Sequence, residues 1–481
     1  MAFSSAPTAK RTSRSSAPCD TWRTTSQHTG LSSVLATFPL ISHNSPDAVV
    51  AYRAGAPIRA ATFLADVMRV AAALPDGRHV LNACGDRYRF TVAFAASLVA
   101  DKVSLLPSTH TPEVVRRLTE FAPDVFCLTD DSRCQIDLPR VRFPDAAGAE
   151  TVPWQPLQIE PERLAAYVFT SGSTGTPLPY KKTWGRLVNC VRFEAERLGL
   201  LDGRSHAIVG TVPPQHMYGF ESTVLLALQS GNAFSAGRPF YPADVCSELG
   251  SVPQPRMLVS TPVHLRTLLA AGVHLPSADL VLSATAPLSQ NLAREVEHRF
   301  ETRLLEIYGS TETGQIASRR TAHTVEWQLF SGVRLFSDTE QTWAEGGHVE
   351  QPTPMCDVLE VTARDRFLLH GRLSDLVNIA GKRSSLSYLN HQLNAIAGVV
   401  DGAFFVREED ESSSTGVTRV AALVVAPSLD AAAVTEQLRK RIDPVFLPRP
   451  LLFVDSLPRN DTGKLPHEAL LSFATNAMKR A

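Results

Sequence analysis

The chain has 481 residues, of which 44% are hydrophobic, and a formal net charge of −1. This length has room for roughly two to four domains, and the composition supports large packed cores rather than disorder. The near-neutral charge excludes a protein that attracts nucleic acid or an acidic membrane through a general electrostatic field. The most apolar run, residues 90–100, is too short for a transmembrane helix, which needs about 20 residues.

Two features bear on where the protein works. The seven cysteines are scattered and form no C-x-x-C pair, which fits a reducing compartment and predicts a cytoplasmic location. Residues 1–30 are rich in Ser and Thr and have one acid, Asp20, and their composition resembles that of an organelle transit peptide. They have no apolar segment of the kind that a secretory signal needs. We expect a disordered leader over 1–30, or a start placed too early.

From about residue 31 onward, short apolar runs alternate with helical patterns. Residues 88–100 are long enough for a helix, and residues 290–300 place Leu292, Val296 and Phe300 on one apolar stripe. The strand-like runs are 79–85, 102–108, 125–130, 165–172, 206–213, 256–262, 280–287 and 303–310. This alternation predicts an α/β fold whose large N-terminal domain, 31–373, has parallel or mixed sheets covered by helices. Ligands of such sheets bind at the carboxyl ends of the strands.

The last part of the chain predicts a second, smaller domain over 374–481. Residues 402–427 indicate two strands around a charged, Ser-rich loop, residues 430–442 a helix, and residues 449–458 a strand. We therefore expect a small, mobile α+β domain. Residues 371–383 have few structural preferences and are interpreted as the linker.

The loop "TSGSTGT", residues 170–176, follows a predicted buried strand. Its hydroxyls and backbone N–H groups suit phosphate oxygens. The Walker pattern, which requires Gly-Lys, is absent. Taken alone, the loop is equally well explained as a plain turn between a strand and the next element.

Four motifs in order resemble those of the adenylate-forming superfamily, which includes acyl- and aryl-CoA synthetases. They are "TSGSTGTP", "YGSTETG", "GRLSD" followed by "AGKR", and "LPRNDTGK", and the similarity runs from residue 31 to the C-terminus. The resemblance implies an AMP-forming acid–thiol ligase. Such an enzyme joins a small carboxylic acid to the α-phosphate of ATP with Mg²⁺, and a phosphopantetheine thiol then takes the acyl group.

The resemblance assigns the β- and γ-phosphates to the loop over 170–176. The residues that it implies there are Thr170, Ser171, Gly172, Ser173, Thr174 and Gly175. One position departs from the family pattern, because Leu178 stands where relatives usually carry a lysine. Lys181 or Lys182 could reach back to compensate, and the sequence leaves the choice between them open.

The motif "YGSTETG" resembles the adenylate motif of the family. By this resemblance Tyr308 stacks on adenine, Thr311 bonds the α-phosphate and Glu312 binds Mg²⁺, a hard cation that suits a carboxylate. A polar turn with an exposed acid is the alternative.

Two further nucleotide contacts are implied by the resemblance. Ala284, Thr285 and Ala286 match the loop that lines adenine, with a plain turn as the alternative. Asp357 lies fifteen residues before Arg372, the spacing that separates the ribose-binding Asp from the linker Arg in the family. The triplet around Asp357 is Met-Cys-Asp instead of Thr-Gly-Asp, so this assignment depends on spacing, and an ordinary surface acid is the alternative.

Lys464, in "RNDTGK", resembles the catalytic lysine of the adenylation step. A cation that bridges carboxylate and α-phosphate oxygens after domain closure stabilises the transition state more than the ground state. The second domain is then expected to rotate and present Gly381 to the thiol. Ser374 and Asn378 depart from common residues of the hinge and linker, which affects the thiol step more than adenylation.

The segment "HMYGFES" resembles the motif that gates the carboxylate. His216 is the expected gate, with Tyr218 and Phe220 as an aromatic wall, and a core histidine is the alternative. Asp, which amino-acid-activating relatives use near this point, is absent from the segment. Glu221 could pair an ammonium or simply favour a helix N-terminus, and we expect a substrate without an amino group.

"TPLPYKKTWG" and "HMYGFE" together resemble the ligases encoded with bacterial aryl-polyene and xanthomonadin pigment pathways. This resemblance implies pigment biosynthesis and a hydroxybenzoate-like aromatic acid, with an acyl carrier protein as the acceptor. Transfer to free CoA is the alternative. A non-catalytic nucleotide-binding relative is a further alternative, which the substitutions at Leu178, Cys356 and Asn378 favour.

Overall fold

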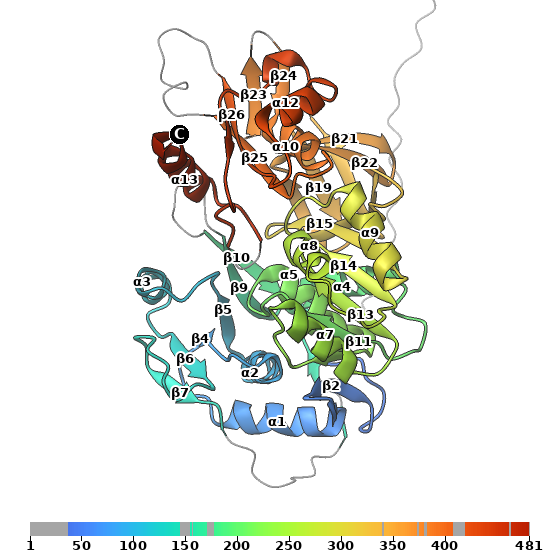
Figure 1. The fold of residues 1–481 in the computed structure, drawn as a ribbon. Helices are drawn as coiled ribbons and strands as arrows, with labels where there is room; N and C mark the ends of the chain where they lie inside the picture. Colours follow the sequence, from blue (N-terminus) through green and yellow to red (C-terminus); the bar gives the residue numbers. More distant parts are fainter. Residues whose placement is uncertain are drawn as a thin grey trace, which may run out of the picture. The chain divides into compact units, whose positions relative to one another are not determined.

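The structure, a computed structural model, describes residues 37–144, 154–155, 157–170, 178–338, 341–372, 375–379, 382–406, 419–460 and 463–480. All of them belong to one compact unit of the chain, Thr37–Ala481 (Figure 1). The predicted leader, most of the predicted phosphate loop, Ser374 and Gly381 lie outside the described residues. In the described part, no helix is long and apolar enough to cross a membrane.

The first sheet has six strands in the order β10-β9-β5-β4-β6-β7. Its strands run parallel, except that β10 pairs antiparallel with β9 at the edge. The bounds are β4 His79–Asn82, β5 Val103–Leu106, β6 Phe126–Thr129, β7 Arg140–Arg142, β9 Leu164–Thr170 and β10 Leu178–Thr183. Helix α1 Ala60–Ala72 precedes β4 along the chain, and helices α2 Arg87–Val99 and α3 Pro112–Phe121 lie between strands of this sheet.

The second sheet has eleven strands in the order β21-β22-β17-β16-β15-β14-β13-β11-β12-β2-β3. Its centre, from β15 to β2, is parallel, and antiparallel strands extend it on both sides. The central strands are β2 Val49–Arg53, β11 Ala207–Gly210, β12 Ala233–Ser235, β13 Arg256–Ser260, β14 Leu280–Ser283 and β15 Arg303–Ser310. The flanking strands are β3 Ala56–Arg59, β16 Gly314–Arg319, β17 Trp327–Leu329, β21 Asp357–Ala363 and β22 Arg366–Arg372.

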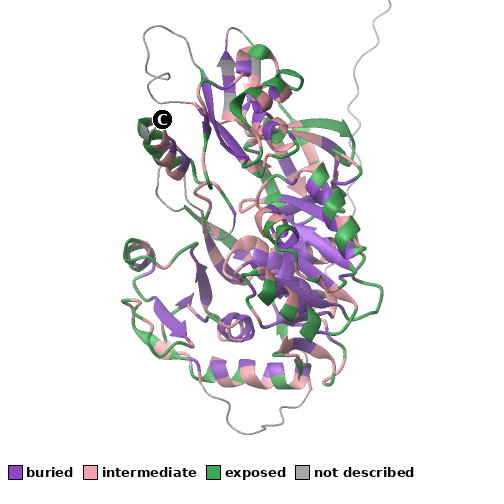
Figure 2. Ribbon diagram, viewed as in Figure 1, coloured by how far each residue is buried: buried purple, intermediate pink, exposed green. Residues whose placement is uncertain are grey.

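Helices cover this sheet because its central strands are apolar on both faces. Val209, Leu258 and Val281 pack into one core with α7 Pro242–Ser251, α8 Pro262–Ala270 and α9 Gln290–Phe300. The alternate residues, among them Ile208 and Met257, belong to a second core with α2 and α4, Trp184–Leu198. Figure 2 shows these strands as a continuous buried layer. The predicted α/β architecture is confirmed, since two-sided burial is what continuous apolar runs indicate.

Capping side chains fix where the helices begin. The Asp86 carboxylate accepts from Arg89 N at the start of α2, and Ser289 Oγ accepts from Leu292 N at the start of α9. The predicted stripe of α9 is buried as expected. The remaining elements before residue 357 are β1 Phe38–Pro39, β8 Gln158–Ile159, α5 Met217–Gly219, the π-helical turn η1 Phe220–Leu225, α6 Leu226–Ser230, β18 Val333–Ser337, β19 Thr342–Gly346 and β20 Val349–Pro354.

The C-terminal region has the predicted strands and helix. They are β25 Asp401–Val406, β26 Val420–Val425, α12 Ala431–Arg439 and β27 Leu451–Phe453, accompanied by α10 Leu386–Asn394, the 3₁₀ turn η3 Pro444–Phe446 and α13 His467–Arg480. The expectation that residues 371–383 have few structural preferences is wrong in part. Residues on both sides of position 380 pair as a hairpin, β23 Leu376–Ile379 with β24 Lys382–Ser385. Val377 and Ile379 alternate toward the core around Leu389 of α10, which gives the hairpin a buried face.

A fully buried arginine connects the first sheet to the second. Arg87, the first residue of α2, donates to the carbonyls of Gly210 and Val212 after β11, at 2.9 and 2.8 Å. It also donates to Ser235 O at the end of β12 and to Gly237 O, at 3.1 and 2.8 Å. Helix α2 packs on β4 and β5 of the first sheet, so one guanidinium fixes that layer against the strand ends of the other sheet.

Arg87→Met is expected to destabilise the protein by about 3 kcal/mol, because four buried carbonyls lose their donors. Arg89→Met on the same helix is the matched control. Its guanidinium lies 3.7 Å from Asp130 and is partly exposed, so it should cost less than about 1 kcal/mol. Urea unfolding measures both variants, and equal midpoints for the two would contradict a structural role for the buried cation.

Candidate functional site

Polar loops gather at one edge of the large sheet. The strands β11, β13, β14 and β15 run parallel, so their carboxyl ends and the segments that follow them share that edge. These segments carry His216, the 284–286 loop and the 308–314 motif, as the sequence predicts. The predicted phosphate residues Ser171, Gly172, Ser173, Thr174 and Gly175 lie outside the described residues. Thr170 is the last residue of β9.

The predicted adenylate motif forms a tight turn between β15 and β16. Ser310 Oγ and Thr313 Oγ1 lie 3.1 Å apart, and Thr313 N donates to Ser310 Oγ at 3.1 Å. Gly309 is required here, because a Cβ at this position would lie 2.3 Å from Gly314 O. The turn leaves Thr311 and Glu312 half-buried at its tip.

The structure brings Tyr308 and Asp357 together. Tyr308 Oη donates to Asp357 Oδ2 at 2.5 Å, and the tyrosine ring packs on Trp327 and Phe367 with centroid distances of 5.5 Å. Asp357 begins β21 and is paired in register with Arg372, the last residue of β22. The two residues that the sequence related by spacing alone are therefore opposite each other. Their roles toward a nucleotide stay predictions.

The 284–286 loop has an unusual backbone. Thr285 has φ +78°, a conformation that a β-branched residue rarely adopts. Ala284 is buried at the end of β14, and Ala286 is half-buried. Backbone strain of this kind persists where the surrounding structure imposes it and gathers at functional sites, which is compatible with the predicted adenine contact.

His216 is the N-cap residue of α5, and α5 continues directly into the π-helical turn η1. Such turns are frequent at functional sites. Phe220, expected as a wall of the acid pocket, lies instead in the core, with its ring centroid 4.8 Å from that of Phe94. Phe220 packs inward because it begins the buried turn η1, whereas Tyr218, two residues earlier, is half-buried.

The two candidate lysines after the phosphate loop differ in burial. Lys182 is 3% exposed, and its Nζ donates to Thr311 O of the adenylate motif at 2.5 Å. Lys181, the preceding residue of β10, is exposed. Successive residues of a strand point to opposite faces, so only one of the two can enter the space between the sheets.

A buried polar cluster surrounds Lys182, and the sequence reasoning missed most of it. Cys190 Sγ lies 3.4 Å from Glu221 Oε1, and the Gln315 amide lies 2.8 Å from Ser222 Oγ and 3.0 Å from Glu194 Oε1. The signal that was available is Glu194 itself. It continues an apolar stripe of α4, where an acid is unexpected.

Burial controls the charges of this cluster. It raises the pKa of Glu194 to about 8. It also raises the pKa of Glu221, with the Lys182 ammonium opposing that shift, and it lowers the pKa of Lys182, with Glu221 opposing. His348, also buried, has its pKa lowered to about 3 and is neutral. Within the cluster, Lys182 and Glu221 each favour the charged form of the other against the effect of burial.

Lys464 lies on a loop fixed by backbone contacts. Lys464 N donates to Asn460 Oδ1 and Asn460 N donates to Lys464 O, both at 2.9 Å. Arg459, at the start of this loop, makes two hydrogen bonds with Asp401 at 2.7 and 2.8 Å. A Cβ at Gly463 would lie 3.5 Å from Thr261 Oγ1, just after β13. The predicted catalytic lysine thus follows a residue that lies at the same sheet edge as the other motifs.

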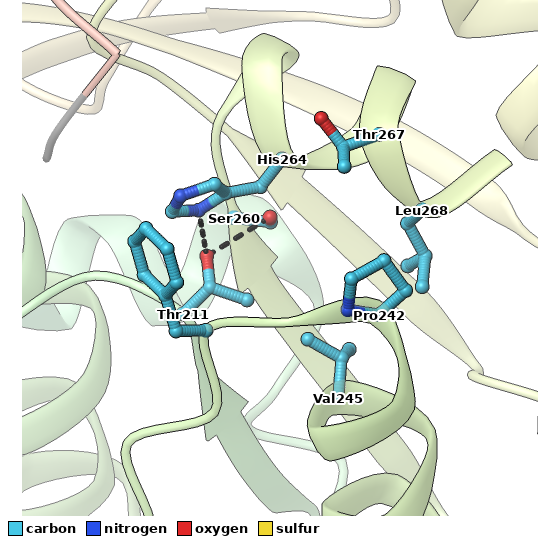
Figure 3. A pocket seen from close by; sticks show the side chains of 8 residues that line it. Thr211, Pro242, Val245, Ser260, His264, Thr267 and Leu268 are labelled. Carbon is cyan, nitrogen blue, oxygen red and sulfur yellow. Dashed lines mark hydrogen bonds between the residues drawn. The ribbon is translucent and has the colours of Figure 1, made fainter. Parts of the chain in front are cut away.

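A small hollow lies at the ends of β11 and β13. His264 Nδ1 is 2.8 Å from Thr211 Oγ1, which is 3.0 Å from Ser260 Oγ, and Figure 3 shows the three side chains turned toward one another. Phe240 covers the imidazole, with ring centroids 5.5 Å apart. None of the predicted site residues lines this hollow.

The site fits a metal that arrives with a nucleotide. Within the described ranges, no group of three or more His, Cys, Asp and Glu side chains could hold a metal ion. Mg²⁺ is commonly bound by one or two carboxylates together with substrate phosphates. Glu312, half-buried at the tip of its turn, is the carboxylate that the sequence predicts for this role.

Comparisons with known proteins agree with this geometry. The family model described as AMP-binding enzyme matches residues 37–362. A 4-coumarate–CoA ligase from Rhodobacter capsulatus is 28% identical over 312 residues, which cover 64% of this chain and 76% of the relative. A 4-chlorobenzoate–CoA ligase from an Arthrobacter species is 28% identical over 161 residues, covering 32% of this chain and 30% of the relative.

Solved structures share the fold. ATP-bound MatB from Rhodopseudomonas palustris gives a TM-score of 0.77 at 19% identity, covering 90% of this chain and 97% of that one. The o-succinylbenzoate CoA synthetase MenE from Bacillus subtilis, in complex with its acyl-adenylate OSB-AMP, gives 0.73 at 17% identity, covering 88% and 94%. At these identities the likeness concerns the fold.

The fold and the motif loops at the strand ends define a nucleotide-dependent enzyme of the adenylate-forming class. The chain belongs to the AMP-binding enzyme family, and it is an AMP-forming acid–thiol ligase.

The raised pKa of Glu194 leads to a prediction of how the free energy of unfolding depends on pH. The unfolded chain releases this proton near pH 4.5 and the folded protein near pH 8, so the stability that the neutral carboxyl contributes is full below pH 4.5 and falls as pH rises toward 8. The slope for one proton is at most about 1.4 kcal/mol per pH unit. Glu194→Gln is expected to remove this slope, so the variant should gain stability relative to the wild type between pH 5.5 and pH 7.5.

Urea unfolding at several pH values measures the effect. Glu196→Gln, an exposed position on the same helix, is the control and should follow the wild type at every pH. Parallel curves for wild type and Glu194→Gln would show that this carboxyl is ionised in the folded protein.

Proposed function

We propose that the protein activates an aromatic carboxylic acid with ATP and transfers the acyl group to a phosphopantetheine thiol. The observation that carries the proposal is the meeting of Tyr308, Asp357 and the Thr311–Glu312 turn at one sheet edge. These residues match the family's contacts to adenine, ribose, α-phosphate and metal. Membership in the AMP-binding family supports this interpretation.

In the first half-reaction, a carboxylate oxygen of the acid attacks the α-phosphorus of ATP. The bond to the β-phosphate breaks, and pyrophosphate leaves with the electron pair. Thr311 donates to the α-phosphate, and Lys464 supplies a cation to the two anions as they meet. Mg²⁺, held by Glu312 when bound, neutralises phosphate charge.

In the second half-reaction, the thiol sulfur attacks the acyl carbon of the adenylate. A C–S bond forms, the thiol loses its proton, and AMP leaves with the electrons of the C–O bond. Because pyrophosphate has already departed, this step no longer requires Lys464. The small domain can therefore present a different face to the thiol.

Several observations support an aromatic acid without an amino group. The relatives are described as 4-coumarate and 4-chlorobenzoate ligases, both named for aromatic acids. Glu221, the acid considered for an ammonium, is 2% exposed and lies beside Cys190 and the Lys182 charge. It is therefore engaged within the protein. A hydroxybenzoate-like acid also agrees with the resemblance to pigment-pathway ligases.

The acceptor thiol has two sources with the same chemistry. The relatives are described as CoA ligases, which favours free CoA. A carrier protein bearing phosphopantetheine is the alternative implied by the resemblance to pigment-pathway ligases. Five cysteines of the described part are free thiols, which supports a reducing, cytoplasmic location: Cys84, Cys127, Cys134, Cys190 and Cys246.

Acid-dependent exchange of labelled pyrophosphate into ATP tests the first half-reaction. We expect exchange with 4-hydroxybenzoate and 4-coumarate, and at least about tenfold less with amino acids, because the engaged Glu221 does not pair an ammonium. Adding CoA or a holo-carrier protein to the loaded enzyme then identifies the acceptor. The proposal fails if no aromatic acid supports exchange.

Lys464→Ala is expected to slow exchange by about 100-fold or more, roughly 2.7 kcal/mol of transition-state stabilisation. Pre-formed acyl-adenylate should still be consumed by thiol at a rate close to that of the wild type. Lys479→Ala, an exposed lysine of α13, is the control for charge removal in the same region. Equal loss of both half-reactions would contradict the use of two conformations.

A further inference from the structure

The chain has a lysine near its phosphate loop, but not at the usual position. Leu178 occupies the position where relatives carry a lysine and is 51% exposed. Four residues later, Lys182 is buried and its Nζ bonds Thr311 O. We infer that Lys182 is a positioning residue for the nucleotide, which acts by fixing the Thr311–Glu312 turn.

The side chain of Lys182 points to a different face of β10 from that of Lys181. In the β9–β10 pair, Lys182 is opposite Ala166 and Lys181 is opposite Tyr167, so the two side chains lie on opposite faces. A register irregularity follows between Lys182 and Thr183, where β10 leads into α4. The Lys182 side chain therefore leaves the edge of the first sheet toward the second, where the turn after β15 begins.

The Lys182 ammonium has both acidic and basic neighbours. Its ammonium is attracted by Glu221 and, more weakly, by Glu312, while Arg186 repels it. A buried charge without such partners costs several kcal/mol. Since Glu312 is the predicted Mg²⁺ ligand, the ammonium lies close to the carboxylate whose position matters most for the metal.

The hydrogen bond from Lys182 to the Thr311 carbonyl oxygen has a consequence for nucleotide binding. Fixing the Thr311 carbonyl restrains the peptide that leads into Glu312, and so the point from which the Glu312 side chain extends. The other side of the turn is already held by the Ser310–Thr313 contacts. Loss of the ammonium should therefore weaken the binding of ATP and Mg²⁺, with little effect on the acid.

The test compares Lys182→Met with Lys181→Met in the 481-residue chain. Lys182→Met retains the length of the side chain and removes the donor and the charge. We expect the KM for ATP and the Mg²⁺ concentration for half-maximal exchange to rise by about tenfold, the loss of one charge-assisted hydrogen bond. The KM for the acid should stay within about twofold, and Lys181→Met should match the wild type in all three.

Lys182→Gln is a second variant, which keeps the test valid if Lys182→Met does not fold. Its amide is a neutral donor suited to a polar cluster, and we expect a KM for ATP between those of the wild type and Lys182→Met. Wild-type KM values and Mg²⁺ dependence in both variants would overturn the inference. Loss of the fold in both would assign Lys182 to the core and would overturn it as well.

The inference rests on the proposed function, and a binding measurement separates the two. Calorimetry with Mg²⁺ and a non-hydrolysable ATP analogue needs no acid. Binding about tenfold weaker in Lys182→Met supports the inference even if no aromatic acid is activated. Equal affinity in the two proteins, with aromatic acids activated by the wild type, would overturn the inference and leave the proposed function standing.

Discussion

Two buried cations join the two sheets of this protein, and the site depends on that junction. Arg87 extends from α2 to four carbonyls at the ends of β11 and β12, and Lys182 extends from β10 to the carbonyl of Thr311 after β15. A buried cation is costly unless its donors find acceptors in a fixed geometry. Both side chains use backbone oxygens of the opposite sheet as acceptors, so each restrains where the strand ends of one sheet lie relative to the other.

Because of this junction, the described part of the predicted site is held by contacts within the protein. The adenylate turn is held on one side by Lys182 and on the other by Ser310 and Thr313, and Tyr308 is tied to Asp357. Donors held in place stabilise developing charge without reorganisation during the reaction. We propose that the remaining cation, Lys464, is supplied by the small domain, so that its charge acts during adenylation and is withdrawn for the thiol step.

Much of the fold could be predicted from the sequence because strands buried on both faces are continuous apolar runs. The shared location of the motif loops could be predicted as well, because parallel strands bring their carboxyl ends to one edge of the sheet. Local patterns could not reveal which lysine enters the interior, because the partner of Lys182 is 129 residues away. The β23–β24 hairpin was missed for a similar reason, since its buried face is completed by α10. The contacts that Glu194 and Glu221 make with Gln315 and Cys190 arise only when α4, η1 and β16 are packed together.

The most direct test of the central claim is a crystal structure of the protein with Mg²⁺ and an aroyl-sulfamoyl adenosine, a stable analogue of the acyl-adenylate. We expect the sulfamoyl group, which replaces the α-phosphate, to contact Thr311. We also expect the ribose to lie on Asp357, the adenine to lie against Tyr308, and Lys182 to remain bonded to the Thr311 carbonyl. An analogue bound away from this sheet edge, or Lys182 turned from Thr311 toward the ligand, would contradict it.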